Sequence, residues 1–214
     1  MSTEELTLHT EKSREDKITD NWFHLLYTVI RPVFTLFRPI KAVGRENIPD
    51  GPVVICPNHS SMGDPFYVVF AFGRMPMRAM AKIEVMRLPF VGWILGKAGV
   101  FGVDRGKADM KAVKTALKAL KDGNKLLLFP EGTRVKEGES VEVKTGAAMF
   151  ATRTNTPLLP IYIPTKKKWF RPNRVVIGQP YYPKYEGRKP TPEELDAISE
   201  DLMLRVQKLG EGAQ

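Results

Sequence analysis

Short apolar runs alternate with amphipathic stretches along most of the chain after residue 40. Continuous apolar runs that are rich in branched residues are typical of strands buried on both faces of a parallel sheet. The sequence therefore predicts strands at 52–56, 77–81, 125–129 and 157–163, with an edge strand at 174–177.

Helical spacing fills the intervals between these runs. Apolar residues at 110, 113, 117 and 120 recur with the period of a helix, lysines lie on its opposite face, and Gly123 is placed to end it. The pattern predicts helices over 65–72, 109–121, 146–152 and 192–209, and a buried helix or loop over 89–96. Strands that alternate with helices indicate an α/β fold: a single domain with a mostly parallel central sheet flanked by helices, preceded by an N-terminal interfacial helical segment.

Residues 22–37 are apolar and aromatic, but His24, Arg31 and Pro32 interrupt them. Because a spanning helix needs about 20 consecutive apolar residues, we expect no membrane span here. The composition and basic flanks are typical of a helix pair in a membrane interface, broken at Pro32; a helix packed on the domain's own core is the alternative. We expect an acidic, flexible N-terminus over 1–20, an amphipathic membrane-interface helical segment over 21–40 and an α/β domain over 41–214.

Charge is unevenly distributed along this chain of 214 residues with a formal net charge of +9. Residues 1–20 hold three basic and six acidic side chains, residues 21–190 hold 28 and 12, and residues 191–214 hold two and six. A basic body favours an anionic partner: nucleic acid, an anionic membrane or a phosphorylated substrate. Charge alone does not choose among these.

Cysteine and histidine usage limits the cofactor chemistry. The single cysteine, Cys56, excludes an internal disulfide and a cysteine-built zinc site, and His9, His24 and His59 lack metal-ligand spacing. We therefore expect no metal and a reducing compartment. The first 20 residues are polar and acidic, unlike a secretory signal.

The segment after the first predicted strand carries the most informative chemistry. His59 stands at the strand exit, five residues before Asp64 at a helix start. A carboxylate that folds back onto one imidazole nitrogen makes the other nitrogen a general base, and a substrate hydroxyl would then be the attacking group. A capping role for Asp64 beside a loop histidine is the alternative. Neither Ser60 nor Ser61 lies in a Gly-x-Ser-x-Gly elbow, which disfavours a covalent serine nucleophile.

A second candidate segment follows the strand predicted at 125–129. Arg134 could bind a phosphate, while Thr133, Gly132 and Glu131 offer further donors and an acceptor at the edge where open α/β sheets bind ligands. Arg105 is a candidate for a second phosphate contact. The stretch around it is no Walker loop, because such a loop would need Gly at 101 and Ser or Thr at 108.

These motifs occur together in one order: Asn-His-x4-Asp after a strand, a Gly-x-x-Phe-x-x-x-Arg-like stretch, Phe-Pro-Glu-Gly-Thr-Arg after the next strand, and Leu159-Pro160 in an apolar strand. In this the chain resembles the glycerolipid acyltransferases, over about residues 35–180, and among them the bacterial-type 1-acyl-sn-glycerol-3-phosphate (lysophosphatidic acid) acyltransferases. The His-x4-Asp and Phe-Pro-Glu-Gly-Thr-Arg elements are highly specific to that family.

The resemblance implies that His59 deprotonates the free hydroxyl of a lysophospholipid while Asp64 holds its imidazole. The hydroxyl would attack an acyl-CoA or acyl carrier protein thioester, without an acyl-enzyme or a cofactor. The acceptor-binding positions implied by the resemblance are Arg105, Glu131, Gly132, Thr133 and Arg134. Val135 departs from the Ser that is usual after Thr-Arg, and residues 136–143 are unusually charged, whereas Lys144 and Gly146 match the pattern again.

The resemblance also accounts for the basic body, because lysophosphatidate lies in an anionic membrane. It implies a peripheral or monotopic protein at the cytoplasmic face of the cell membrane, with no nucleic-acid partner. Residues 166–171 combine basic and aromatic groups, as an interfacial contact or a solvated loop would. Flexible apolar walls for an acyl chain could come from Met75, Met77, Met80, Met86, Leu88, Phe90, Trp93 and Leu95.

Three other functions stay open at this point. The acceptor could be another lysophospholipid or a lyso-aminolipid. The same base could activate water in a hydrolase. In a different class, the chain could be a non-catalytic basic protein that binds lipid or nucleic acid. The sequence leaves the thioester donor, the acyl-chain length and the oligomeric state open.

Overall fold

A computed structural model describes residues 13–106, 108–134 and 143–212. Its seven-stranded sheet has the order β1-β7-β6-β2-β5-β3-β4 and pairs in parallel throughout, except between β6 and β7. The strands are β1 (Ile40–Val43), β2 (Val54–Pro57), β3 (Met77–Lys82), β4 (Val100–Val103), β5 (Lys125–Leu127), β6 (Leu158–Tyr162) and β7 (Asn173–Ile177). The predicted α/β fold with a mostly parallel central sheet is confirmed.

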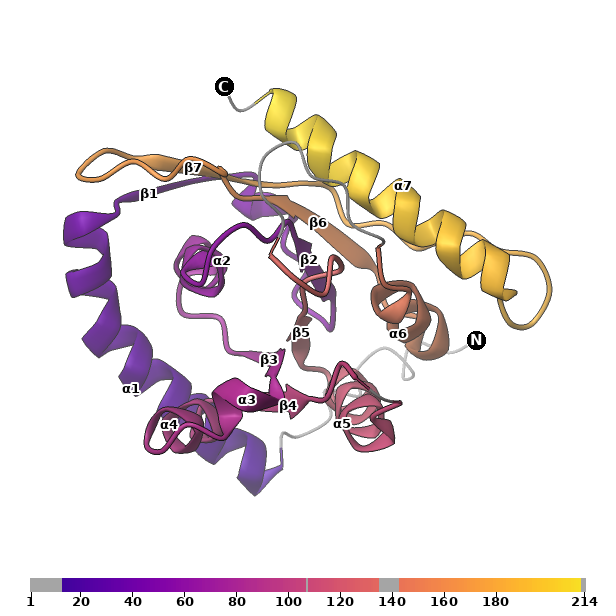
Figure 1. Cartoon of the computed structure of the whole chain (residues 1–214), viewed down its shortest axis with the longest axis horizontal. Helices are drawn as coiled ribbons and strands as arrows, with labels where there is room; N and C mark the ends of the chain where they lie inside the picture. Colours follow the sequence, from indigo (N-terminus) through magenta and orange to yellow (C-terminus); the bar gives the residue numbers. More distant parts are fainter. Residues whose placement is uncertain (1–12, 107, 135–142, 213–214) are drawn as a thin grey trace, which may run out of the picture.

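Helices cover both faces of this sheet (Figure 1). They are α1 (Arg14–Phe37), α2 (Asp64–Phe72), α3 (Ile83–Met86), α4 (Val91–Lys97), α5 (Met110–Lys121), α6 (Gly146–Thr154) and α7 (Pro192–Glu211), with a 3-10 turn at Arg45–Asn47. Helices α1 and α2 lie on one face, and α5, α6 and α7 on the other. Successive residues from Val53, just before β2, to Cys56 alternate between two cores, because side chains of extended backbone point to opposite faces. Val53 and Ile55 join one core, and Val54 and Cys56 join the other.

The sheet differs from the expected one at its margins. The segment 173–177 is a strand but not an edge, because β1 lies outside it and pairs with it in parallel. Strands β1 and β4 form the two edges and were not predicted. Both are only four residues long and half exposed, so neither shows the continuous apolar run by which buried strands are recognised.

Helix α1 is one continuous helix and not the helix pair predicted from Pro32, which lies inside it. Its inward face packs on the core: Phe23 and Tyr27 are buried, and the ring of Phe34 lies 5.1 Å from that of Phe70. Packing both before and after the proline holds the two halves against the same core, which opposes the kink that proline favours. The helix also begins earlier than the predicted segment at 21–40. Most of the predicted flexible N-terminus lies outside the described residues.

A buried arginine anchors the start of α1 to the sheet. Arg78 in β3 donates to Asp16 at 2.6 Å and to Asp20 at 2.9 Å, and all three side chains are largely shielded from water. Ser13 caps the helix by accepting from the Asp16 amide. The helix is thus fixed at its first two turns as well as along its apolar face.

Strand direction decides which segments meet at the functional edge. Strands β2, β3, β4, β5 and β6 run the same way, so their carboxyl ends share one edge of the sheet. Strands β7 and β1 run the opposite way and therefore begin at that edge. Consequently the end of α1, which leads into β1, and the loop 163–172, which leads into β7, lie beside the loops that follow β2 and β5.

Candidate active site

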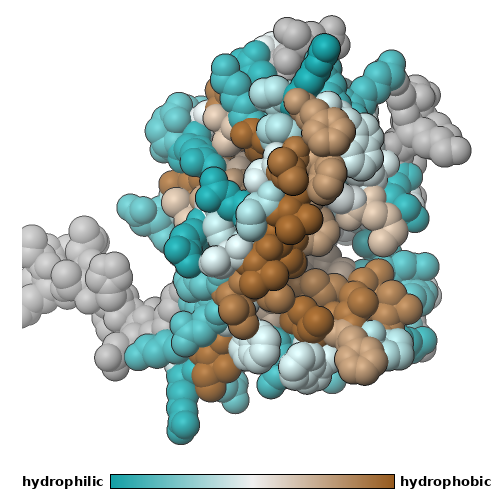
Figure 2. All heavy atoms as spheres, turned by 90° about the vertical axis from the view of Figure 1, so that its left-hand side faces the viewer, coloured by the Kyte–Doolittle hydropathy of each residue, from teal (hydrophilic) through white to brown (hydrophobic). Residues whose placement is uncertain are grey.

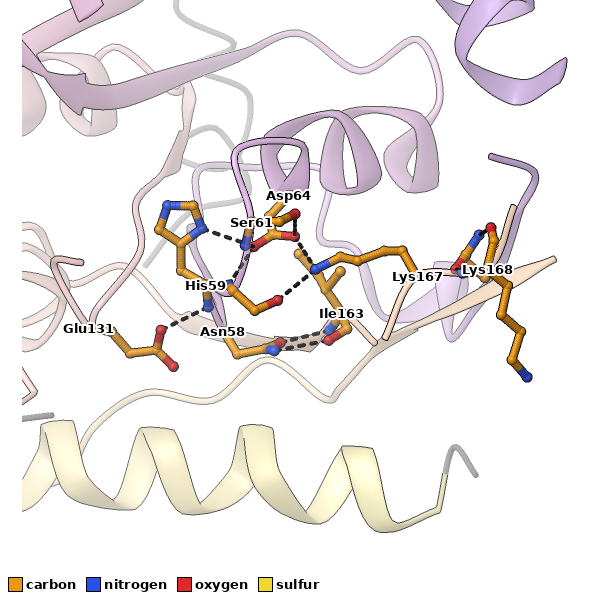
Figure 3. Close-up of polar contacts among 10 residues, drawn as sticks. Asn58, His59, Ser61, Asp64, Glu131, Ile163, Lys167 and Lys168 are labelled. Carbon is orange, nitrogen blue, oxygen red and sulfur yellow. Dashed lines mark hydrogen bonds and ion pairs between the residues drawn. The ribbon is translucent and has the colours of Figure 1, made fainter. Parts of the chain in front are cut away.

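The loop after β2 is held in place by an asparagine. Asn58 accepts from the Ile163 amide at 2.7 Å and donates to the Ile163 carbonyl at 2.9 Å, as a further backbone segment would (Figure 3). These two bonds tie the β2 loop to the end of β6. The next residue, His59, is thereby fixed at the carboxyl edge of the sheet, where open α/β sheets bind ligands.

His59 and Asp64 meet as the sequence predicts. Imidazole Nδ1 lies 2.9 Å from Asp64 Oδ2, and Asp64, the first residue of α2, is completely buried. Asp64 does not cap α2 in the predicted way, because the N-cap residue is Gly63. Its carboxylate instead turns back into the loop between β2 and α2.

Both carboxylate oxygens of Asp64 accept hydrogen bonds from several donors. Oδ2 also accepts from the Ser60 and Ser61 amides at 2.6 and 2.7 Å, while Oδ1 accepts from the Ser61 hydroxyl at 2.8 Å and faces the Lys167 ammonium at 2.6 Å. Burial by itself would raise the pKa of this carboxyl. The hydrogen bonds from His59, Lys167 and Ser61 and the lysine charge outweigh it and hold the pKa well below its usual range. Asp64 is therefore an anion at any ordinary pH.

The second imidazole nitrogen of His59 is available for chemistry. With Nδ1–H directed at a carboxylate, the tautomer leaves the lone pair on Nε2, and Nε2 has no hydrogen-bond partner within the described ranges. The imidazole stacks on the Phe129 ring with centroids 4.1 Å apart, and 14% of the side chain is exposed. A fixed, partly accessible imidazole paired with an ionised carboxylate is the geometry of a general base.

Glu131 lies on the other side of His59. Its Oε2 accepts from the His59 backbone amide at 2.8 Å. Burial, with a smaller contribution from the Asp64 charge, raises the pKa of Glu131 to about 7, although the hydrogen bond from His59 opposes the shift. Glu131 thus binds the backbone of the loop that carries His59, a role that the sequence pattern did not specify.

The other predicted acceptor positions surround Glu131. The Arg105 guanidinium donates to the Gly132 carbonyl, which joins the loops after β4 and β5. Gly132 has φ +63°, in the left-handed region that favours glycine, and a Cβ there would lie 3.2 Å from Lys144 Cγ. Thr133 and Arg134 are exposed and extend from this point. Val135 and most of 136–143 lie outside the described residues, as does Lys107.

Lys167 is the site residue that sequence reasoning missed. It was grouped with its neighbours as part of an interfacial stretch, yet its side chain is only 7% exposed and its ammonium also donates to the Ser60 hydroxyl at 2.6 Å. Figure 3 shows it pointing into the site while Lys168 points away. In a run of three lysines nothing in the sequence marks the one that turns inward.

A pocket of about 670 Å³ opens beside the Asp64 side of this site. Its walls come from the last turns of α1, the start of α2 and the loop before β7. Two cations, Arg38 and Lys167, lie among apolar and aromatic groups; the remaining lining residues are Val33, Phe34, Phe37, Ser61, Gly63, Tyr67 and Trp169. Such a mixture suits an amphipathic anion.

A second, smaller cavity of about 130 Å³ lies between α1, α2, α4 and the sheet. It has no charged lining residue, and Pro65 and Phe66 connect its wall directly to Asp64 in the chain. Met77 and Leu95, two of the residues expected to line an acyl tunnel, are among its walls. An apolar cavity of this kind is suited to hydrocarbon.

An apolar band lies on the outer face of α1. Val29 and Val33 are about 60% exposed, and Leu25 and Leu36 extend the same stripe, which is separate from the buried stripe of the helix. Figure 2 shows a continuous hydrophobic band that broadens at its lower end. We call this surface the apolar band; it comprises Leu25, Val29, Val33 and Leu36 of α1 and Leu88, Phe90, Val91 and Trp93 at α4.

The expectation that residues 89–96 are buried is wrong. Residues 91–97 form a helix, but Phe90 is 82% and Trp93 57% exposed, so this helix is not buried. Trp93 contacts Trp22 of α1 with ring centroids 5.6 Å apart, which joins the two parts of the band. No helix within the described ranges is both long and apolar enough to cross a bilayer.

An aromatic and basic cluster continues from the end of α1. Phe37 contacts Trp169 and Phe170 of the loop before β7, and the Arg38 guanidinium lies 3.8 Å from the Trp169 ring centre. All three aromatic side chains are exposed. Exposed aromatic rings combined with cations are typical of contacts at a membrane surface.

Comparison with known proteins agrees with this site. A family model described as Acyltransferase matches residues 39–164. A 1-acyl-sn-glycerol-3-phosphate acyltransferase of Bacillus subtilis is 30% identical over 188 residues, 84% of this chain and 92% of that protein. The protein of the same name from Pseudomonas aeruginosa is 28% identical over 187 residues, 82% of this chain and 71% of that one.

The crystal structure of the 1-acyl-sn-glycerophosphate (LPA) acyltransferase of Thermotoga maritima has the same fold. It superimposes with a TM-score of 0.62 at 26% identity and covers 94% of this chain and 84% of that one. The chain belongs to the acyltransferase family, and it is an enzyme of that family. The family inferred from the order of the motifs is confirmed.

Proposed function

We propose that this protein transfers a fatty acyl group from acyl-CoA or acyl carrier protein to the free sn-2 hydroxyl of 1-acyl-glycerol-3-phosphate, giving phosphatidate. The observation that carries the proposal is the 2.9 Å contact between His59 Nδ1 and the buried Asp64, within a chain whose relatives are named for that reaction. The reaction as proposed uses no metal and no cofactor beyond the thioester.

His59 Nε2 takes the proton of the acceptor hydroxyl as the oxygen attacks the thioester carbonyl. Asp64 stabilises the imidazolium that forms, and the departing thiolate takes the proton back. The C–S bond breaks and one ester C–O bond forms, so the reaction balances without a further reactant.

Direct transfer without an acyl-enzyme is supported by the two serines of the loop. The Ser60 hydroxyl accepts from Lys167, and the Ser61 hydroxyl donates to Asp64. Both hydroxyls therefore lie on the Asp64 side and are occupied there. A serine nucleophile would instead need its hydroxyl within hydrogen-bond reach of the basic nitrogen.

The acceptor phosphate is proposed to bind at Arg105 and at the loop that carries Gly132, Thr133 and Arg134, which Arg105 contacts through the Gly132 carbonyl. Guanidinium groups bind phosphate bidentately, and an exposed Thr133 hydroxyl can add a donor. The anchoring of Arg105 on the Gly132 carbonyl orders this loop next to Glu131 and His59. The cavity without charged lining beside α2 is proposed to accept the acyl chain.

Peripheral binding at the cytoplasmic face of a membrane follows from the same proposal. The apolar band would enter the boundary between headgroups and acyl chains, and the basic body would be drawn to anionic lipid. Phe37 and Trp169 of the aromatic cluster also line the 670 Å³ pocket, which would let a lysophospholipid pass from the membrane toward the site.

The proposal is tested with purified protein, an acyl-CoA or an acyl carrier protein thioester, and a panel of lyso-lipids in mixed micelles. Thiol release and lipid products are both followed. Phosphatidate formed with lysophosphatidate as the preferred acceptor supports the proposal. A different preferred lyso-lipid would replace the acceptor, free fatty acid formed without acceptor would indicate a hydrolase, and saturable vesicle binding without turnover on either donor would favour a lipid-binding protein.

A further inference from the structure

A lysine ammonium is buried against the catalytic pair. Lys167 lies in the loop between β6 and β7, and its side chain is 7% exposed, whereas Lys168 beside it is exposed. Burying an ammonium costs free energy unless the charge is paired and hydrogen-bonded. The position of Lys167 therefore depends on the groups that it meets.

Lys167 meets two groups, and both belong to the His59 loop. Its Nζ lies 2.6 Å from Asp64 Oδ1 and 2.6 Å from the Ser60 hydroxyl. The ammonium also lies 5.9 Å from the centre of the buried Tyr67 ring. Asp64 is thus held from two sides, by the imidazole on Oδ2 and by the ammonium on Oδ1.

The arrangement places an anion directly beside the His59 imidazole and a cation on the far side of that anion. An anion beside an imidazole favours the imidazolium, and a cation that shares this anion reduces the effect. The charged groups in and beside the site come from each of its walls: Asp64 of α2, Lys167 before β7, Glu131 and Arg105 of the loops after β5 and β4, and Arg38 at the end of α1. Without Lys167, the charge of Asp64 would act on His59 with less opposition.

We propose that Lys167 is a positioning residue for acyl transfer: it fixes the Asp64 carboxylate against the His59 imidazole and offsets the carboxylate's charge there. This inference rests on the proposed function, in which His59 must accept a proton. The motifs by which this sequence resembles the family do not include Lys167, which reaches the site from a loop about 100 residues farther along the chain.

The test compares three variants with the wild type. Lys167→Met removes the charge and the hydrogen bonds, Lys167→Gln keeps a hydrogen-bonding side chain without the charge, and Lys168→Met is the matched control on the same loop. The pH profile of kcat/KM for acyl transfer is measured for each, and thermal unfolding checks that each variant is folded.

We expect the acid limb of the profile to move to higher pH by about one unit in both Lys167 variants, because an opposite or like charge a few ångströms away shifts a titration by this order. Activity below the limb then falls about tenfold, with a smaller change on the alkaline plateau. Lys168→Met should follow the wild-type profile. A uniform loss at every pH, or a raised acceptor KM with the limb unmoved, would overturn the inference.

A second readout does not depend on turnover. The imidazole of His59 is titrated by NMR, and its signal is assigned as the one that disappears in His59→Ala. The titration should move to higher pH in the Lys167→Gln protein and stay in place in Lys168→Met. If the midpoint of the His59 titration is the same in Lys167→Gln as in the wild type, the inference is refuted, even if acyl transfer is demonstrated. If the midpoint moves to higher pH in a protein that shows no acyl transfer, the effect of the lysine is supported and the proposed reaction is not.

Discussion

Replacing Asp64 by Asn should remove activity and stability together, for reasons visible in its contacts. The carboxylate receives donors at both oxygens: His59 Nδ1 and two backbone amides at Oδ2, the Ser61 hydroxyl and the Lys167 ammonium at Oδ1. An amide has only one oxygen. In either orientation its NH2 group must face donors, and the Lys167 charge loses its ionic partner.

The expected losses of stability and of activity in Asp64→Asn can both be estimated. Leaving one member of a buried ion pair unpaired costs about 3 to 5 kcal/mol. For a domain of this length each kcal/mol lowers Tm by roughly 2 to 4 °C, so we expect a fall of about 10 °C. The corresponding Asp→Asn change in the serine-protease triad lowers kcat about 10⁴-fold, and we expect a loss of about 10³ to 10⁴-fold in this protein.

The assay measures thiol release for kcat and thermal unfolding for Tm, with Asp196→Asn, an exposed position on α7, as the control. The double variant Asp64→Asn/Lys167→Met should recover part of the lost Tm, because the unpaired ammonium is gone, yet remain inactive. A single Asp64→Asn variant that keeps a tenth of the wild-type kcat would refute the assigned role. A Tm no lower than that of Asp196→Asn would refute the buried ion pair.

Three further predictions concern other parts of the molecule. Arg78→Met should lower the free energy of unfolding by about 3 kcal/mol, because Asp16 and Asp20 lose a buried partner; equilibrium denaturation measures this, and a change under 1 kcal/mol would contradict the anchoring of α1. Glu131 has its pKa raised from about 4.5 to about 7 by burial, so the stability that its protonation contributes is present in full below pH 4.5 and lost as pH rises through 7. The stability of the wild type relative to Glu131→Gln should therefore fall between pH 5 and 8, and a constant difference would count against the shift. Val29→Glu should weaken binding to anionic vesicles in sedimentation without lowering Tm, since the side chain is exposed within the apolar band; undiminished binding would place the membrane contact elsewhere.

Elements with strong internal periodicity could be predicted from the sequence. Helix α5 shows apolar positions at helical spacing and lysines on its other face, and the structure has it at Met110–Lys121. The fully buried strand β2 shows a continuous apolar run. The meeting of His59 and Asp64 could also be predicted, because a five-residue separation at the junction of strand and helix brings the two side chains together through local geometry alone.

Features that depend on tertiary contacts could not be predicted in this way. The inward turn of Lys167 is decided by Asp64, 103 positions away, and its two neighbouring lysines have the same sequence character. Strand β1 is recognisable only through its pairing with β7. The apolar residues of α4 suggested burial, but they cover one side of a short helix whose other side packs on the domain, and they remain exposed.

The proposed reaction depends most directly on His59 as the base that activates an acceptor hydroxyl. The decisive measurement is the rate of phosphatidate formation from lysophosphatidate and a long-chain acyl thioester by the wild type, His59→Ala and His24→Ala, the last a histidine of α1 outside the site. We expect product from the wild type and from His24→Ala, and none above the uncatalysed rate from a folded His59→Ala protein. Sustained phosphatidate formation by His59→Ala would contradict the role of His59 as the base.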